Sequence, residues 1–420
     1  MMAGRLRAFA CVALAVAELV LFTALPRGAA GEKPPSIKIG LSAGFSGPTR
    51  AMALELYRGA QAAFAARNRE GGIHGHPVEL LAADDRYQPD PAIENIVRFL
   101  VADKVLTLFS SLGTPTVSRE LPVLRAYAKQ GARLFFPVSG LQASRVPPYV
   151  RYVYNLRASY RQEIEGLVAA FVAQGRSRIA ICHQADAFGR SGWDGARRAL
   201  AKRGLSLCGE ATFARSVGAD EDMTRQVVLL ADCHPDAVLI VGPAPACAAL
   251  IRDLRGHGLT MPVGVVSFAG GEILLRVLID EGKRCGRNLE DGLVMSQVTP
   301  DWRDSGLPAS RDYRRDLAAL AHAPVPPGGW DKHPLAGSAT GFEGYLNARL
   351  LLAVLAAMAD PQDRAGLDAA VASLGPVDLG IGVPVVLTGP HHQGLDKVYL
   401  STASRGRLVP LTSMRIAAGD

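Results

Sequence analysis

The sequence has few cysteines, and none of them lies in a spacing that binds zinc. Of its 420 residues only 6 are cysteine, with no C-x-x-C pair and no partnered histidine spacing of the zinc type. A G-x-G-x-x-G pattern is also missing after the first predicted strand, which excludes a dinucleotide site there. We therefore expect neither a metal site nor a bound cofactor.

Blocks of basic residues are absent as well. The formal net charge is +7, and removal of the first 30 residues, which contain three arginines and Glu18, lowers it to roughly +5. No run of lysine and arginine lies beside interleaved aromatic residues. The positive charge is too diffuse to indicate a nucleic-acid partner.

Long hydrophobic runs are missing except at the N-terminus. Arg5 and Arg7 precede an apolar stretch over residues 8–25, and small residues follow it. This pattern is typical of a signal peptide over residues 1–30 and predicts export to the periplasm as a soluble protein. A retained anchor helix is the alternative, because about 18 apolar residues just span a bilayer. A lipoprotein is disfavoured, since Cys11 comes before most of the run.

An odd number of cysteines remains once this segment is removed. The six cysteines minus Cys11 leave five, namely Cys182, Cys208, Cys233, Cys247 and Cys285. At most two disulfides can form within the chain, so at least one thiol is free. Cys208 and Cys233 are the expected pair, because both fall near the starts of predicted strands in one lobe.

The length and the order of the predicted elements indicate an α/β protein with two lobes. A chain of 420 residues exceeds what one hydrophobic core usually holds. Short buried runs alternate with helical patterns and then restart, at 37–41, 78–82, 105–109 and 133–136, and after 153–156 at 178–182, 205–208, 237–241, 262–266 and 292–295. This alternation predicts two doubly wound parallel sheets. A helix over 342–358 and a hairpin over 383–409 are expected to follow.

Small polar residues follow several of these strands. Parallel sheets bind ligands beyond the carboxyl ends of their strands, so these residues are candidates for a binding site. The sharpest candidate is the step Gly113-Thr114-Pro115. Thr114 is a good N-cap and Pro115 a good first helical residue, so free amides around 112–116 would face an anion, with Ser139 beside them.

A catalytic alternative stays open at this point. Residues 40–44 satisfy the G-x-S-x-G pattern of an α/β hydrolase with Ser42 as nucleophile. That pattern normally follows several strands, whereas here it follows the first. The paired histidines at 74–76 and 391–392 lie in predicted loops and are not expected to bind a metal. No complete set of catalytic residues is present, so we expect a binding protein rather than an enzyme.

Several motifs together resemble a known family. They are the opening strand 37–41 with Ser46-Gly47-Pro48, the segment 71–80, Asp84-Asp85, Phe136-Pro137, residues 184–189 and Gly341-Phe342-Glu343-Gly344-Tyr345. From residue 37 to its end the chain is similar to the periplasmic type I solute-binding proteins of ATP-driven (ABC) importers, in the leucine/isoleucine/valine-binding branch. The same fold occurs in ligand-sensing domains, so transport and sensing both remain open.

The resemblance implies two lobes joined by a three-strand hinge, with the ligand held between them. Lobe 1 would comprise residues 36–155 and 299–390, and lobe 2 residues 156–298 and 391–420. The expected partners are a small solute and a membrane permease, and the protein would be a monomer. The matching positions in the cleft are Met52, Ser111, Leu112, Gly113, Thr114, Val138, Ser139, Gly140, Phe188, Gly242, Ser267 and Phe268.

One departure from the family affects the choice of ligand. Amino-acid receptors of this family usually hold the ligand's ammonium group with an acidic residue after the fourth strand of the second lobe. Here Ser267-Phe268-Ala269 stands at that place, with Glu272 only nearby, and Pro243 replaces the usual aromatic after Gly242. An aromatic or aliphatic carboxylate is therefore as serious a candidate as an amino acid.

Overall fold

The computed structural model describes residues 34–320 and 323–411, and the chain from Ser36 onward forms one compact unit. The expected signal peptide over 1–30 lies outside the described residues. Within the described ranges, no helix is both long enough and apolar enough to cross a membrane.

The first sheet has five parallel strands in the order β2-β1-β3-β4-β5. Its strands are β1 (Ile37–Ala43), β2 (Val78–Asp84), β3 (Thr107–Phe109), β4 (Leu134–Phe135) and β5 (Val153–Tyr154). The helices that connect them are α2 (Arg50–Arg69), α3 (Pro89–Val101) and α4 (Thr114–Ala126). Buried side chains on every strand explain why these short runs pack as a parallel sheet between helices.

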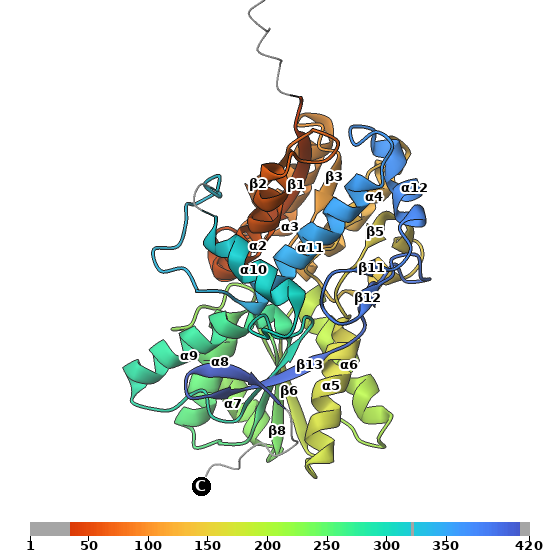
Figure 1. The fold of residues 1–420 in the computed structure, drawn as a ribbon. Coiled ribbons are helices and arrows are strands. Elements are labelled where there is room, and N and C mark those ends of the chain that lie inside the picture. The colour runs from red at the N-terminus through yellow and green to blue at the C-terminus, as the bar shows by residue number, and fades with distance from the viewer. Residues whose placement is uncertain (1–33, 321–322, 412–420) are drawn as a thin grey trace, which may run out of the picture. The chain divides into compact units, whose positions relative to one another are not determined.

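The second sheet has seven strands in the order β14-β13-β10-β9-β8-β6-β7. Its parallel strands are β6 (Ile179–Gln184), β7 (Glu210–Phe213), β8 (Ala237–Val241), β9 (Val263–Val265) and β10 (Leu293–Gln297), and the antiparallel ones are β13 (Tyr399–Ser404) and β14 (Arg407–Pro410). Its helices are α5 (Tyr160–Ala173), α6 (Ala187–Ala201), α7 (Thr224–Ala231), α8 (Ala244–Gly256) and α9 (Gly271–Cys285). Figure 1 shows the two sheets, each with its own helices.

The chain returns to the first sheet after β10. It forms α10 (Pro308–Ala318), α11 (Ala339–Ala356), α12 (Leu367–Ser373) and the small pair β11 (Val377–Asp378) and β12 (Pro384–Val385). It then crosses to the second sheet for β13 and β14, and on the way Asn155 pairs with Gln393. Short 3-10 turns complete the fold at η1 (Gly47–Thr49), η2 (Ala128–Gln130), η3 (Gln142–Arg145), η4 (Val150–Tyr152), η5 (Ser267–Ala269) and η6 (Arg364–Gly366).

The expected fold class, two lobes of parallel strands, is confirmed. Two elements differ from expectation. The strand expected at 205–208 is wrong, because the structure places β7 at Glu210–Phe213. Both segments alternate in polarity, and pairing with β6 buries Ala211 and Phe213. The terminal hairpin is β13 with β14 and is narrower than expected, since β12 pairs with β11 instead.

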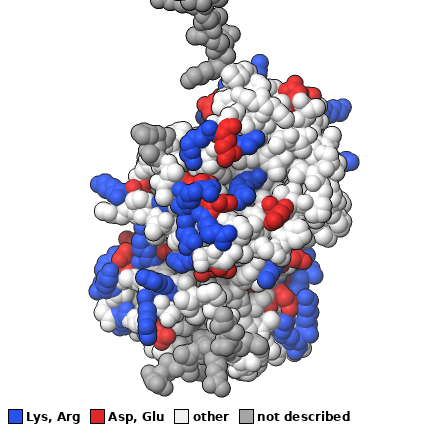
Figure 2. Space-filling view, viewed as in Figure 1, with Lys and Arg blue, Asp and Glu red and all other residues white. Residues whose placement is uncertain are grey.

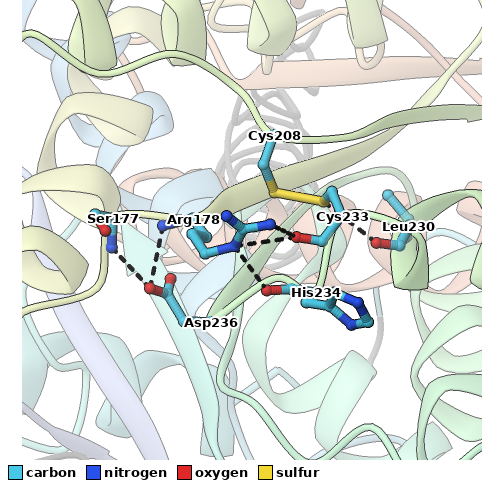
Figure 3. Close-up of a disulfide and its surroundings, with 7 residues drawn as sticks. All are labelled: Ser177, Arg178, Cys208, Leu230, Cys233, His234 and Asp236. Atoms are coloured by element: carbon cyan, nitrogen blue, oxygen red, sulfur yellow. Dashed lines mark hydrogen bonds between the residues drawn. A yellow bond between two sulfur atoms is a disulfide. The ribbon is translucent and has the colours of Figure 1, made fainter.

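The expected disulfide is confirmed. Cys208 and Cys233 are bonded, with their Cα atoms 5.7 Å apart, at the end of the second sheet where β6 and β8 begin (Figure 3). The Arg178 guanidinium donates to the carbonyls of Cys233 and His234, and Asp236 accepts from the Arg178 amide. The disulfide therefore fastens a loop on the side of the sheet away from the carboxyl ends of the strands.

Charged residues on the surface are mixed in sign. Figure 2 shows lysine and arginine interspersed with aspartate and glutamate over the face that carries α10. On α10 itself, Arg315 pairs with Asp312 and Asp316, and Arg349 of α11 also reaches Asp312. Part of the positive charge on this face is thus paired with neighbouring carboxylates.

Helices α2 and α11 pack with their backbones in close approach (Figure 1). A Cβ atom added at Gly59 would lie 1.8 Å from the Gly341 carbonyl oxygen, and one at Gly344 would lie 2.3 Å from the Leu56 carbonyl oxygen. Only hydrogen fits at these positions. The glycines of the Gly341–Tyr345 motif therefore serve helix packing that ties the segment after β10 to the first sheet.

A buried ion-pair network joins the two lobes near the first crossing of the chain. The Arg157 guanidinium lies 3.2 Å from the Glu163 carboxylate of α5 and 3.4 Å from the Glu343 carboxylate of α11. All three side chains are almost fully buried. Glu163 also accepts from the Ser267 amide and the Ser296 hydroxyl. Burial lowers the pKa of Arg157, but Glu343 and Glu163 outweigh it and hold that pKa above its usual value.

Substitution Gly59→Ala should destabilise the protein, although alanine is the better helix former by about 1 kcal/mol. The added methyl group overlaps the Gly341 carbonyl, and overpacking of this kind costs roughly 1–3 kcal/mol. Urea unfolding measures the change. Gly389→Ala, where no atom lies within 4 Å of the added Cβ, is the matched control. Equal stability of the two variants would contradict the close packing.

Substitution Arg157→Met should lower the free energy of unfolding by roughly 3–5 kcal/mol, because it leaves two carboxylates buried without a cation. Adding Glu163→Gln and Glu343→Gln to this variant should recover much of the lost stability, because no buried charge is then left unpaired. The control is Arg161→Met, whose partly exposed pair with Asp194 contributes about 1 kcal/mol or less. If denaturant titration gives the same loss for Arg157→Met and Arg161→Met, the network does not carry the stability assigned to it.

Candidate functional site

Two hydroxyl groups meet at the carboxyl edge of the first sheet. The Oγ1 of Thr114 lies 2.8 Å from the Oγ of Ser139, and 3.2 Å from the Oη of Tyr160 across the cleft. The expectation that Thr114 is an N-cap is wrong, because α4 begins at Thr114 and Gly113 occupies the cap position. Since the hydroxyl does not cap the helix, it is directed to Ser139 and Tyr160 instead.

The backbone of this edge is partly paired. The Leu112 amide donates to the Ser42 carbonyl and the Gly113 amide to the Val138 carbonyl. Gly113 has φ +114, and a Cβ there would lie 2.6 Å from the Tyr87 ring. Two of the amides expected to be free are therefore used within the sheet, and the first-turn amides of α4 are left for a ligand or water.

Aromatic side chains line the facing edge of the second lobe. The Phe188 ring, at the start of α6, lies 5.0 Å from the Tyr160 ring and 4.8 Å from the Phe268 ring. Phe188 is fully buried, and its two ring partners belong to the same lobe. Phe268 reaches the first lobe, with its ring 6.0 Å from that of Tyr87. The rings of Phe188 and Phe268 thus form an aromatic wall that lies against the polar edge of the first lobe.

Hydrogen bonds also cross between the lobes. The Gln184 side-chain amide donates to the Tyr87 hydroxyl, and Arg215 donates to the Gln88 side chain. The Tyr160 amide donates to the Gly140 carbonyl over 3.0 Å. These contacts come from the ends of β2, β4, β6 and β7 and from the start of α5, so the carboxyl edges of the two sheets face each other.

A cavity of about 270 Å³ lies beside these contacts. Its lining comes from the segment after β4 and from α5 and α6, namely Gly140, Leu141, Gln142, Tyr160, Arg161, Ala187, Arg190, Ser191 and Asp194. Because Tyr160 touches both this cavity and Thr114, the cavity and the Thr114–Ser139 hydroxyls belong to one region.

Two buried arginines lie under the cleft. Arg157 donates to the Ser267 hydroxyl. Arg145 is buried and donates to the carbonyls of Leu141 and Arg157. Burial and the nearby charge of Arg157 lower the pKa of Arg145 to about 9. The edge at Ser267 contacts both members of the buried ion pair, since its hydroxyl accepts from Arg157 and its amide donates to Glu163.

Some buried polar atoms at the edges have no hydrogen-bond partner among the described residues. They include the Oγ of Ser111, the Oε1 of Gln184 and the Nε of Arg157. Buried polar groups of this kind nearly always have a partner in folded proteins.

The predicted site residues separate into two groups. Thr114, Ser139, Gly140, Phe188, Ser267 and Phe268 come together around the cleft, with Ser111, Leu112, Gly113 and Val138 forming its first-lobe edge. Met52 is buried in the first turn of α2. Gly242 packs instead on Phe213 and Cys247 within the second lobe.

Two cleft residues, Tyr87 and Tyr160, were not predicted as ligand contacts. Tyr87 follows β2, so the rule that ligands bind after parallel strands would have found it had it been applied to that strand. Its φ of +57 also marks an unusual backbone position. Tyr160 begins α5 rather than following a strand, so that rule does not reach it.

The catalytic alternative gains no support from geometry. Ser42 is fully buried; its hydroxyl donates to Asp85 over 2.8 Å and accepts from the Asn95 side chain. None of its hydrogen bonds within the described ranges involves a histidine. In the same part of the chain, no group of three or more His, Cys, Asp or Glu residues could hold a metal ion.

The chain is similar in sequence and in structure to proteins that are named as binding proteins. An amino acid binding protein from Pseudomonas aeruginosa is 24% identical over 229 residues, covering 53% of this chain and 58% of that protein, so less than two thirds of its length is matched. A crystal structure of a possible leucine/isoleucine/valine-binding protein from Rhodopirellula baltica is 28% identical, with a TM-score of 0.81 and coverage of 93% of this chain and 100% of that one.

A third similarity is to a solved structure that contains a bound ligand. A solute-binding protein of an ABC transporter from R. palustris, in complex with 4-hydroxybenzoate, is 16% identical with a TM-score of 0.73, covering 89% of this chain and 95% of that one. At this identity the likeness shows the fold alone. The family model described as periplasmic binding protein matches residues 36–407. The chain therefore belongs to the periplasmic binding protein family.

Proposed function

We propose that the protein is the solute-binding component of an ATP-driven importer and that it binds a small carboxylate with an apolar body between its lobes. The observation that carries the proposal is the meeting of the Thr114 and Ser139 hydroxyls, across the cleft from Tyr160 and the aromatic wall of Phe188 and Phe268. Hydroxyl donors and first-turn helix amides suit an anion, while aromatic rings suit an apolar body.

The hydrogen bonds at Ser267 support a ligand that lacks an ammonium group. The carboxylate beside Ser267 is that of Glu163, and it already pairs with Arg157 and accepts from the Ser267 amide and the Ser296 hydroxyl. A buried ammonium group without a free carboxylate partner is costly, which disfavours an amino acid. Relatives named for amino acids and a fold neighbour bound to 4-hydroxybenzoate make both classes reasonable to test.

Export and transport complete the proposal. The family name places such proteins in the periplasm, and the pattern over residues 1–30 is that of a signal peptide. The partner would be the membrane permease of the importer, and the protein would act as a monomer without catalysing a reaction. Loss of uptake of the bound carboxylate in cells that lack this protein would support transport, whereas unchanged uptake would favour sensing.

Replacement of both anchoring hydroxyls should weaken carboxylate binding by roughly 1–3 kcal/mol, since each leaves part of a buried charge unpaired. A thermal-shift screen of valine, leucine, benzoate, 4-hydroxybenzoate and hexanoate first identifies the ligand, because a ligand at about 100 times its Kd stabilises the fold by about 2.7 kcal/mol. Calorimetry then compares wild type with Thr114→Ala/Ser139→Ala.

Ser118→Ala is the control for that comparison. Its hydroxyl lies on the same helix but donates to the Pro115 carbonyl, away from Ser139. Affinity should be unchanged in this variant. An unchanged affinity in the double variant as well would remove Thr114 and Ser139 from the site.

Two phenylalanines of the aromatic wall should differ in their effect on closure. Phe268→Ala removes the ring that reaches Tyr87 and should reduce the ligand-induced compaction seen by small-angle scattering, because the closed state is favoured only by contacts made in it. Phe188→Ala should mainly lower stability without ligand, by roughly 3–5 kcal/mol. If saturating ligand compacts the Phe268→Ala variant fully, the aromatic contact between the lobes has no role in closure.

A further inference from the structure

Two carboxyl groups are buried directly behind the polar edge of the first lobe. Asp85 follows β2, and Glu120 lies in the second turn of α4; both are fully buried. Ser111, which stands between β3 and α4 on the edge itself, is buried with them. Neither carboxyl group is used in the proposed binding of the solute.

The hydrogen bonds of this cluster are incomplete. Asp85 accepts from the Ser42 hydroxyl and from the Tyr87 amide, each over 2.8 Å. Both carboxyl oxygens of Glu120 and the Oγ of Ser111 have no hydrogen-bond partner within the described residues. The Ser111 hydroxyl lies near enough to Glu120 to lower the pKa of that carboxyl group, but this effect is smaller than that of burial. An ionised carboxylate in such surroundings would be strongly destabilised.

Among the described residues, no cation compensates these two acids. The charged group that acts on Glu120 is Asp85, and the one that acts on Asp85 is Asp84. Helix α3 contributes the amide of Asn95, and its charged residues Asp90, Glu94 and Arg98 are exposed. Arg119 and Arg125 of α4 and Arg190 of α6 are exposed as well, while Asp194 of α6 pairs with Arg161 and Arg198.

We propose that Asp85 and Glu120 form a proton-binding site and that its proton is coupled to the binding of an anion at the Ser111–Thr114 edge. The proton site rests on the buried, uncompensated carboxyl groups alone. The coupling also rests on the proposed function, since it requires an anion at that edge. A proton from solvent adds to a carboxylate oxygen and no other bond changes.

The direction of the pKa values agrees with this assignment. Burial raises the pKa of Glu120 to about 8 and that of Asp85 to about 7. Each folded-state value lies above that of an unfolded carboxyl group, so the folded state binds more protons between about pH 4 and pH 8. Stability from these groups is therefore fully present below that range and is lost as the pH rises through it.

The coupling follows from the distance between the two sites and from their like charges. Glu120 lies six residues after Thr114, so about 9 Å separate them along the helix axis at 1.5 Å per residue. An anion at the edge repels a carboxylate at that range in a medium of low polarity and favours its protonated form. Binding should take up protons near pH 8, and affinity should fall roughly tenfold from about pH 6 to about pH 9.

The proton site is tested first, without any ligand. Infrared spectra of the full chain near neutral pH should contain a carboxylic-acid C=O band that is weakened in Glu120→Gln and in Asp85→Asn. Both substitutions are close in shape to the native residue, and if one variant fails to fold, the other still tests the assignment. Spectra that are unchanged in both variants, or a wild-type protein without the band, would overturn the proposal.

The coupling is tested with benzoate, which stays ionised from about pH 6 to about pH 9. Calorimetry in buffers of different ionisation enthalpy should give proton uptake near pH 8 in wild type and little in Glu120→Gln. Asp316→Asn is the control, because Asp316 is a buried carboxylate on α10 that accepts from the Tyr345 hydroxyl and pairs with Arg315. It should retain the wild-type uptake.

The outcomes separate this proposal from the proposed function. Benzoate binding without proton uptake in wild type, or equal uptake in wild type and Glu120→Gln, would overturn the coupling. If the affinity for benzoate depends on whether the buffer contains Na⁺ or K⁺, and not on pH, a metal cation rather than a proton compensates the two acids. That result would also overturn the coupling. Failure of every carboxylate to bind refutes the proposed ligand class, while the infrared result still decides the proton site.

Discussion

The buried guanidinium of Arg157 is the constraint on which the arrangement of the cleft depends. Its two carboxylate partners come from different lobes, Glu163 on α5 and Glu343 on the helix that packs against α2. A buried cation with two anions is costly to leave incomplete, so the three groups are held in one geometry. That geometry fixes the point where the chain first crosses between the lobes.

The same guanidinium determines the chemistry of the second-lobe edge. Arg157 donates to the Ser267 hydroxyl, and its guanidinium carbon lies 5.9 Å from the centre of the Tyr160 ring. Tyr160 in turn contacts Thr114 and Gly140 of the first lobe. The residue that joins the lobes therefore also fixes the Ser267 hydroxyl and lies beside the aromatic ring that contacts Thr114.

Much of the fold could be predicted because parallel strands buried on both faces leave continuous apolar runs in the sequence. The error at β7 arose where that signal is weakest, since a strand at the end of a sheet alternates in polarity and two adjacent segments alternate equally well. Pairing with β6 decides between them, and pairing is not visible in a single segment.

The site was harder to predict than the fold. Thr114 was identified from its position, but its role as a cap was wrong because Ser139 and Tyr160, distant in sequence, compete for its hydroxyl. Arg157 was not among the predicted site residues, since nothing local indicates that Glu343, far along the chain, becomes its partner. Local patterns predicted which edges are polar, and tertiary contacts decide what each polar group does.

The first-lobe edge combines two electrostatic demands that would conflict if both were met by fixed charges. An anion site needs donors and a positive potential, which the first turn of α4 supplies. Directly behind it, Asp85 and Glu120 would oppose an anion if both were ionised. A cation placed between them would remove the conflict, but none of the described side chains supplies it. The remaining way to keep the edge favourable is for the carboxyl groups to hold a proton, which makes their protonation part of the ligand site rather than a property of the core alone.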